Sequence, residues 1–229
     1  MKQSPLNRRQ ALALLGLSTL GATRKVDVDL ALVLAIDCSY SVSAEEYRLQ
    51  MQGMGLAFMN PHVFEAIARG PNKRIAISAF LWSQDQSQYL IIPWRIIAAK
   101  NDAFSIGKHL INTSRDVSPA GTSISSALLY AQVLLEKAPK ALRRVVDVST
   151  DGRSNSGPST ELVRNQMTEA GITINALAIV NEVTDLAPYL EKEVIGGDSS
   201  FVLKANSYKV YGEAILKKLI KEIEGPGVS

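Results

Sequence analysis

The feature that most constrains this chain is a short apolar run, LALVLAI at residues 30–36. It ends abruptly in Asp37, and hydroxyl side chains follow at alternate positions, Ser39 and Ser41. A run that is apolar at every position is typical of a strand with both faces covered. The next residues, SAEE at 43–46, have the pattern of a helix capping box. The motif therefore lies in a turn between a buried strand and a helix.

Similar apolar runs alternate with amphipathic, helix-like stretches along the rest of the chain. This alternation predicts an α/β fold, a Rossmann-like, doubly wound and mostly parallel six-stranded sheet with helices on both faces. The chain has 229 residues, 46% hydrophobic and 21% charged, which indicates one globular domain, placed here at residues 23–229. The strands are expected at residues 28–36, 74–81, 89–94, 143–149, 173–180 and 201–203.

Helices are expected between these strands, at residues 43–69, 102–115, 122–137, 159–170, 185–194 and 207–223. The last helix carries an apolar stripe, because Ile215, Leu219 and Ile223 are spaced to lie on one side. Docking of this stripe on the sheet is the ordinary explanation, and contact with a membrane surface is the alternative.

One pair of strands is expected to be antiparallel. Only the residues WSQDQSQ (82–88) separate the second strand from the third, which is too short for a parallel crossover. One edge strand should therefore run against the others. Trp82 and Trp94 flank this hairpin, and we expect them to pack or to cover the edge, with a partner-contact surface as the alternative.

The first 22 residues have the layout of an export signal. Lys2, Arg8 and Arg9 precede an apolar run at residues 11–20, and small residues follow, ending in Ala22. The apolar run is too short to span a bilayer, which takes about 20 residues. We therefore expect cleavage near Ala22 and a mature periplasmic or extracellular protein without a transmembrane span.

The route of export stays open. The residues NRRQAL resemble a twin-arginine signal, although an alanine stands where that pattern usually has a large apolar residue. The ordinary Sec route is equally compatible with the leader. A disordered or loosely packed first helix is the alternative to a signal.

The basic charge of the chain belongs to this leader. The formal net charge is +3, and the first 22 residues carry three basic and no acidic side chains, so the remainder is neutral. The remainder also lacks a basic stripe interleaved with aromatic residues. Nucleic acid binding therefore has no support in the sequence.

Cys38 is the only cysteine, so the chain has no internal disulfide. At the end of an apolar strand it is expected to be a small buried filler. A nucleophile is the alternative, but activation would need a nearby base, and His62 and His109 are the only histidines.

Two further segments reach the same edge of the predicted sheet as Asp37. VVDVSTDGRS follows the strand at 143–149 with Asp151, and SPAGTSISSAL brings Thr122 to the start of a helix. Ligands of open α/β sheets bind beyond the carboxyl ends of the strands, so the three loops should share one crevice. Each feature alone also has a structural explanation, as a turn or as a helix cap.

Together these loops offer only oxygen donors, which suit a hard cation rather than zinc or copper. Mg²⁺ is the first expectation, with Ca²⁺ or Mn²⁺ as alternatives. Two carboxylates only balance a divalent ion, so an acidic residue of a partner could fill an open coordination position. The candidate ligands are Asp37, Ser39, Ser41, Thr122 and Asp151.

These five positions resemble the metal-ion-dependent adhesion site (MIDAS) of von Willebrand factor type A (vWA) domains. The resemblance covers about residues 26–224, including the single antiparallel edge strand. It implies that the carboxylate and two hydroxyls of DCSYS (37–41) bind the metal directly. It also implies that Thr122 binds in the ligand-ready form, and that Asp151 binds directly or through water. More narrowly, DLALVLAIDCSYSVSAEEYRLQ, RIAISAFLWS, VDVSTDG, AGITINALAI and VIGG are similar to an exported, vWA-like bacterial branch of unknown function.

The first expectation for function is a non-catalytic module of the bacterial cell envelope. It would capture a protein whose Asp or Glu carboxylate completes the metal shell. A metal-dependent hydrolase or phosphatase is the first alternative. Against it, no second acid stands two residues after Asp37, and G-x-S-x-G, G-x-x-x-x-G-K-[ST] and H-E-x-x-H motifs are missing. The second alternative is a metal-free vWA scaffold that binds through its helices or its tryptophan edge.

Overall fold

All six predicted strands form, with small shifts at their ends. The structure is a computed structural model that describes residues 27–115 and 120–226. The predicted export signal at residues 1–22 lies outside the described residues. The strands are β1 (Val28–Asp37), β2 (Ile75–Trp82), β3 (Gln88–Ile97), β4 (Ala141–Thr150), β5 (Thr173–Ile179) and β6 (Val202–Ala205).

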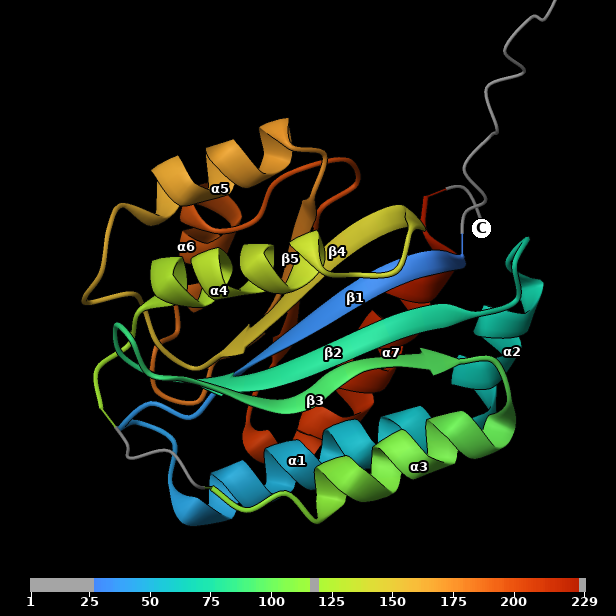
Figure 1. Ribbon diagram of the computed structural model, residues 1–229. Coiled ribbons are helices and arrows are strands. Elements are labelled where there is room, and N and C mark those ends of the chain that lie inside the picture. The colour runs from blue at the N-terminus through green and yellow to red at the C-terminus, as the bar shows by residue number, and fades with distance from the viewer. Residues whose placement is uncertain (1–26, 116–119, 227–229) are drawn as a thin grey trace, which may run out of the picture.

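The strands form one sheet in the order β3-β2-β1-β4-β5-β6. β1 pairs in parallel with β2 and β4, and β5 pairs in parallel with β4 and β6. Only β3 runs antiparallel, beside β2 at the edge, which confirms the predicted fold class. The winding reverses between β1 and β4, which lie side by side in Figure 1. The crevice beyond the carboxyl ends of such a strand pair is the usual ligand site of an open α/β sheet.

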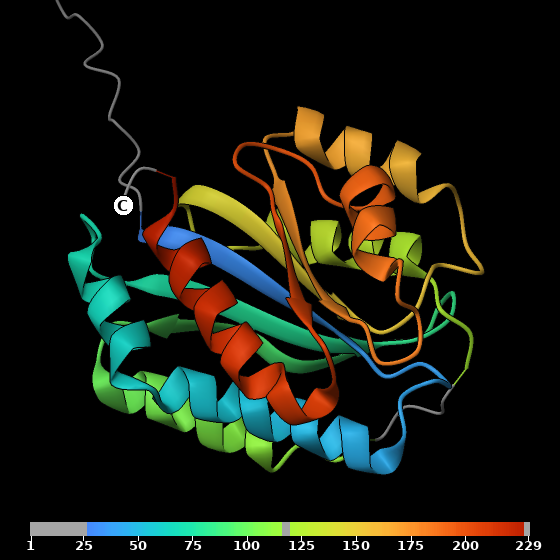
Figure 2. The ribbon, with the colours of Figure 1, turned by 180° about the vertical axis from the view of Figure 1, so that it is seen from behind.

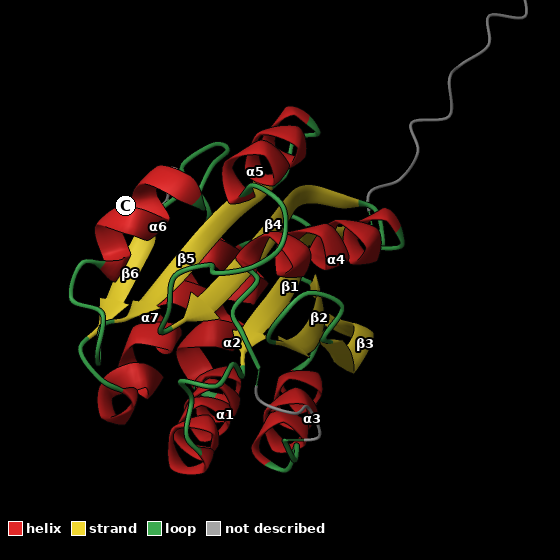
Figure 3. Cartoon of the chain, turned by 90° about the vertical axis from the view of Figure 1, so that its left-hand side faces the viewer, coloured by secondary structure: helices red, strands yellow, loops and turns green. Residues whose placement is uncertain are grey.

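Helices cover both faces of this sheet. The helices are α1 (Ala44–Met59), α2 (Pro61–Arg69), α3 (Lys100–Ile111), α4 (Ile124–Glu136), α5 (Thr160–Glu169), α6 (Leu186–Glu193) and α7 (Tyr211–Glu224), with a 3₁₀ turn η1 (Tyr208–Val210) before α7. One layer contains α1, α2, α3 and α7, and the opposite layer contains α4, α5 and α6 (Figures 2 and 3).

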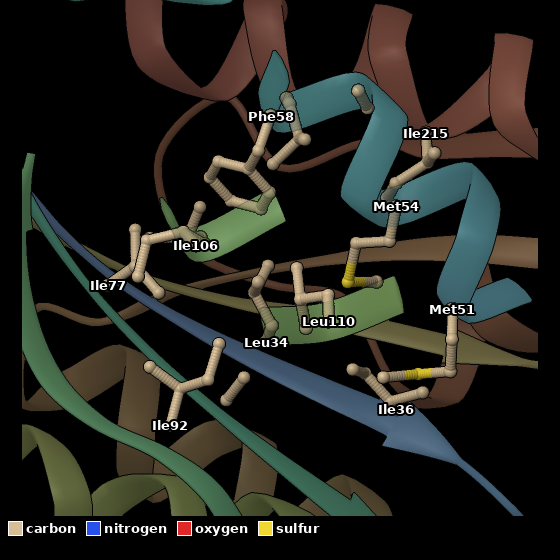
Figure 4. Packing of buried hydrophobic residues seen from close by; sticks show 14 of the residues in the cluster. Leu34, Ile36, Met51, Met54, Phe58, Ile77, Ile92, Ile106, Leu110 and Ile215 are labelled. Atoms are coloured by element: carbon tan, nitrogen blue, oxygen red, sulfur yellow. The ribbon is translucent and has the colours of Figure 1, made fainter. Parts of the chain in front are cut away.

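β1 is buried along its whole length because both of its faces are covered. Successive side chains of a strand point to opposite faces. Leu34 and Ile36 therefore join the hydrophobic cluster under α1, α2, α3 and α7, shown in Figure 4. Val33 and Ala35 join the cluster under α4, α5 and α6. The uninterrupted apolar run thus serves two cores at once.

The single helix expected at residues 43–69 is wrong, because the chain forms two helices there. Proline disfavours the helical conformation of the residue before it, and Asn60 is extended, with φ −69° and ψ 131°. Pro61 then occupies the first turn of α2, where its missing N–H costs nothing. The Asn60 side chain caps α2 by accepting a hydrogen bond of 3.0 Å from the His62 N–H.

The two tryptophans and the apolar stripe of the last helix, for which the sequence allowed either packing or an exposed contact surface, are packed in the structure. Trp82 is fully buried, and Trp94 is partly buried, with its indole N–H donating to the Leu134 carbonyl at 2.9 Å. Ile215 and Leu219 of α7 are fully buried against the sheet, as the docking explanation predicts. Among the described helices, none combines the length and the apolarity needed to cross a membrane.

Candidate metal centre

Asp37 is the last residue of β1, and its side chain is fully buried. One carboxylate oxygen, Oδ1, accepts the Ser39 N–H at 2.7 Å, which turns the chain out of the strand. The other, Oδ2, accepts the Thr150 hydroxyl at 2.5 Å. The Asp37 carbonyl accepts the Gln50 side-chain amide at 2.9 Å. Neighbouring elements therefore hold the aspartate in one orientation at the end of β1, beside the place where the winding of the sheet reverses.

Ser39, Ser41 and Asp151 lie beside this carboxylate. The hydroxyl oxygens of Ser39 and Ser41 are 3.2 Å apart, and the Ser41 hydroxyl donates to Asp151 Oδ1 at 2.6 Å. Ser39 and Asp151 are buried, whereas Ser41 is exposed. Four of the five candidate ligands thus form one connected group that reaches the surface.

Thr122 lies next to this group on the loop before α4. Its Oγ1 would be 3.7 Å from a Cβ built on Gly152, so it faces the turn after Asp151. Asn155 holds the threonine backbone, with its Oδ1 accepting the Thr122 N–H at 2.9 Å and its N–H donating to the Thr122 carbonyl at 2.8 Å. No hydrogen bond joins the Thr122 side chain to the other four candidates within the described chain. It is therefore a neighbour of the group rather than a bonded member.

Arg115 fastens the loop that carries the two serines. Its guanidinium donates to the carbonyls of Val42 at 2.7 Å, Cys38 at 2.8 Å and Ser39 at 2.9 Å. Sequence patterning placed Arg115 at the end of the helix expected at 102–115 and gave it no role, whereas α3 ends at Ile111. An arginine there carries no motif that points to a loop more than 70 residues away. Thr150 was also missed as a partner of Asp37, although it stands inside the recognised STDG segment.

Burial disfavours the charged form of both carboxylates. Burial, supplemented by the charge of Asp151, raises the pKa of Asp37 from 3.8 to about 7. Burial also raises the pKa of Asp151. Among the described ion pairs, none involves either aspartate, and the hydrogen bonds described for the Arg115 guanidinium go to backbone carbonyls. Two buried acids without a compensating cationic side chain fit a divalent metal ion.

The donor set points to a hard ion. Within residues 27–115 and 120–226, no three His, Cys, Asp or Glu side chains form a cluster. A cation at Asp37 and Asp151 would therefore depend on hydroxyl oxygens for further protein ligands. Such an all-oxygen shell is typical of Mg²⁺, Ca²⁺ and Mn²⁺ sites.

Cys38 lies inside the motif but takes no part in this group. It is fully buried, and its thiol donates to the Trp82 carbonyl at 3.1 Å. Burial raises its pKa to about 12, so it is a thiol at neutral pH. The prediction of a buried filler agrees with this environment, and a nucleophile does not.

Comparisons with known proteins agree with this architecture. A family model described as "Protein of unknown function (DUF1194)" matches residues 27–227. No curated protein matches the chain. Solved structures do match the chain, but their sequence identities are so low that the likeness shows the fold alone.

Three of the matching solved structures are described here. Proximal thread matrix protein 1 from the mussel byssus, solved with a zinc-occupied MIDAS motif, has a TM-score of 0.59 and 19% identity over 87% of this chain and 49% of its own. A von Willebrand factor type A protein from Catenulispora acidiphila has a TM-score of 0.60 and 14% identity over 86% of this chain and 43% of its own. Manganese-loaded TRAP protein of Plasmodium vivax has a TM-score of 0.53 and 20% identity over 87% and 75%. The chain spans about half the length of the mussel protein.

Proposed function

This chain belongs to the DUF1194 family of proteins of unknown function and has a vWA-like fold. We propose that it is a non-catalytic module that binds a protein partner through a divalent cation. Asp37, Ser39, Ser41, Thr122 and Asp151 are the proposed ligands, and Mg²⁺ is the proposed ion, with Ca²⁺ or Mn²⁺ as alternatives.

The observation that carries this proposal is the pair of buried carboxylates, Asp37 and Asp151. They are linked through the backbone N–H of Ser39 and the hydroxyls of Ser39 and Ser41, and neither forms an ion pair within the described chain. A divalent cation offsets both charges. The zinc-occupied MIDAS motif of the mussel protein and the manganese-loaded TRAP protein support the binding of a divalent metal ion by this chain.

The partner is proposed to supply an Asp or Glu carboxylate. Two protein carboxylates only neutralise a divalent ion, and the hydroxyl ligands add no charge, so the ion keeps its attraction for a further anionic oxygen. The group opens to the surface through Ser41, and the neighbouring Tyr40 ring is 82% exposed. An exposed aromatic side chain next to the proposed ligands suits contact with a protein surface.

The surroundings of the site favour binding over hydrolysis. A hydrolase needs a base or nucleophile near the metal, and both histidines are engaged elsewhere. His62 contacts Glu65 on α2, and His109 contacts the Ile91 carbonyl on β3. Cys38 keeps its proton. These positions leave the described site without a histidine base or a thiolate nucleophile.

Metal titration of the mature chain tests the proposal. Wild type is expected to bind one Mg²⁺ per chain in isothermal titration calorimetry. Asp37→Ala should abolish binding and Thr122→Ala should weaken it, because each removes a proposed oxygen ligand. Asp198→Ala, which removes an exposed carboxylate from the loop before β6, is the matched control and should bind as wild type does. Equal binding by wild type and Asp37→Ala would show that the ion is held elsewhere.

Partner binding is tested on immobilised mature protein with envelope extract. We expect a protein that is retained with Mg²⁺, released by chelator and displaced by short peptides containing aspartate but not by their asparagine analogues. Retention that survives chelator would favour the metal-free scaffold. Turnover of a phosphate ester that is lost in Asp37→Ala would favour the hydrolase.

The proposed place of action is the bacterial cell envelope or the exterior, reached through a signal at residues 1–22 that Sec or the twin-arginine system reads. N-terminal sequencing of the protein recovered from the envelope fraction of an expressing bacterium should begin close after Ala22. A full-length chain in the cytoplasm would contradict export.

A further inference from the structure

A cavity of about 240 Å³ lies at the opposite end of the strands from the candidate metal centre. The metal centre follows the carboxyl ends of β1 and β4, whereas the cavity is lined by the first residues of β4 and β5 and by the last turn of α7. In Figure 2 the end of α7, in red, lies beside the start of β4, in yellow. The cavity is therefore separate from the proposed site, which gives it no role.

Basic side chains outnumber acidic ones in the lining of this cavity. The basic ones are Arg143, Arg144 and Lys221. Within the described chain, none of the three belongs to an ion pair. Of the two acidic lining residues, Glu222 is already paired with Lys218 at 2.6 Å, which leaves Asp198 to offset the three cations. A hollow lined by unpaired cations attracts an anion.

Neighbouring contacts hold the basic side chains in place without neutralising them. Arg144 donates to a backbone carbonyl at the end of α5, and its guanidinium has five N–H donors, so others remain. Lys221 Nζ lies 4.0 Å from the centre of the Phe201 ring. Arg143 instead uses both terminal nitrogens on two carbonyls in the last turn of α7, at 2.7 and 2.6 Å. Arg144 and Lys221 therefore have the charges that a ligand can use.

The rest of the lining suits an apolar group. Leu142 and Val145 of β4 line the cavity together with the partly buried Phe201. An apolar cavity of about 150 Å³ holds a benzene molecule, so the larger volume found here has room for such a ring with one carboxylate. Sites for small molecules typically combine an apolar lining with a few placed polar groups.

We propose that this cavity binds a small organic carboxylate, whose anionic group is held by Arg144 and Lys221 and whose apolar body packs against Phe201. The planar guanidinium matches the geometry of a carboxylate, and the lysine adds a second positive charge. The proposal does not depend on the proposed function, because the cavity shares no residue with the candidate metal centre.

Benzoate is the probe, measured by calorimetry on the mature chain in chelator. Benzamide keeps the ring without the charge, and acetate keeps the charge without the ring. Each should bind about tenfold more weakly than benzoate or worse, because benzamide loses the charged hydrogen bonds and acetate loses the buried apolar surface.

Variants of the two cationic residues test how the anion is held. Arg144→Gln and Lys221→Gln should each weaken benzoate binding by about tenfold, since each removes a charge-assisted hydrogen bond. Lys217→Gln is the matched control, because it removes an exposed lysine of α7 that does not line the cavity, and it should bind benzoate as wild type does.

A second measurement needs no variant. Adding benzoate to the isotope-labelled mature chain should shift the backbone amide signals of Gly171 and Asp198, which line the cavity, in nuclear magnetic resonance spectra. The amide signals of Ser39 and Ser41 in the candidate metal centre should stay unchanged.

Several outcomes would overturn the proposal. These are the absence of benzoate binding, equal binding of benzamide or acetate, unchanged affinity in Lys221→Gln, and an equal loss in Lys217→Gln. Should Arg144→Gln fail to fold, Lys221→Gln and the amide signals still decide, and shifts confined to residues outside the lining would overturn the proposal as well. None of these outcomes bears on the metal site, because benzoate is measured in chelator.

Discussion

The Ser41 hydroxyl donates a hydrogen bond of 2.6 Å to Asp151 Oδ1, which joins two residues separated by 110 positions. The contact exists because β1 and β4 are neighbours in the sheet, and each strand ends in a turn at the same edge. The centre is therefore a product of strand order, and four predictions concern how its charges, loops and supporting helices behave.

Asp37→Asn should stabilise the metal-free protein and abolish stabilisation by metal. The substitution keeps the shape of the side chain and removes a buried charge that repels Asp151. At about pH 8, where Asp37 is ionised, we expect a gain in unfolding free energy on the order of a few kcal/mol in chelator. Differential scanning fluorimetry with Mg²⁺ and with chelator measures both effects. Asp198→Asn is the control, and an undiminished Mg²⁺-induced rise in melting temperature in Asp37→Asn would contradict the assignment.

Glu222 should make the stability of the protein depend on pH. It is buried with Asp147 and Lys218, and Lys218 Nζ lies 2.8 Å from Asp147 Oδ2 and 2.6 Å from Glu222 Oε1. Two acids share one lysine, and burial together with the charge of Asp147 raises the pKa of Glu222 from 4.5 to about 7. A raised pKa means that the folded state keeps a proton that the unfolded state has released. Its stability contribution therefore falls as pH rises from 4.5 to about 7 and is level above that.

Glu222→Gln removes this dependence. Its unfolding free energy relative to wild type should increase between about pH 5 and about pH 8, measured by urea denaturation in chelator. Glu213→Gln, an exposed change on the same helix, should show a difference that stays constant with pH. A constant difference for Glu222→Gln would mean that Glu222 is already ionised at the lower pH.

Arg115→Lys should loosen the loop that holds Ser39 and Ser41. The guanidinium reaches three carbonyls at once, and a lysine ammonium on a flexible stem cannot reproduce that planar fork. We expect a loss of about 1–3 kcal/mol in unfolding free energy and weaker Mg²⁺ binding. Urea denaturation and calorimetry measure the two effects. Arg95→Lys on the edge strand β3 is the control. If Arg115→Lys binds Mg²⁺ with the affinity of wild type, Arg115 has no role in the metal centre.

Gly107→Ala should destabilise the contact between α1 and α3. A Cβ at Gly107 would lie 2.5 Å from the Gly55 carbonyl oxygen, so the helices would have to separate. Overpacking of this kind costs about 1–3 kcal/mol. Gly212→Ala on α7 is the contrasting change, because its nearest neighbour is 3.4 Å away and alanine favours helix by about 1 kcal/mol. Melting temperatures should fall for the first variant and hold or rise for the second; equal values would contradict the close contact.

Much of the fold was predictable because its signals are local. The uninterrupted apolar run of β1 predicted a strand covered on both faces, and WSQDQSQ predicted the antiparallel edge, since each depends only on neighbouring residues. The break at Asn60 and Pro61 was also visible in the sequence, but the helical pattern on both sides concealed it.

The candidate site also has features that the sequence predicts and features that only the structure shows. The sequence by itself determined which oxygen donors follow which strands, because the donor types and their spacing are written in short motifs such as DCSYS and STDG. Only the tertiary structure decided that Arg115 holds the first loop, that Thr150 binds Asp37 and that Ser41 binds Asp151. Such contacts join residues from distant elements, and their partners follow from how strands and helices pack rather than from any pattern along the chain.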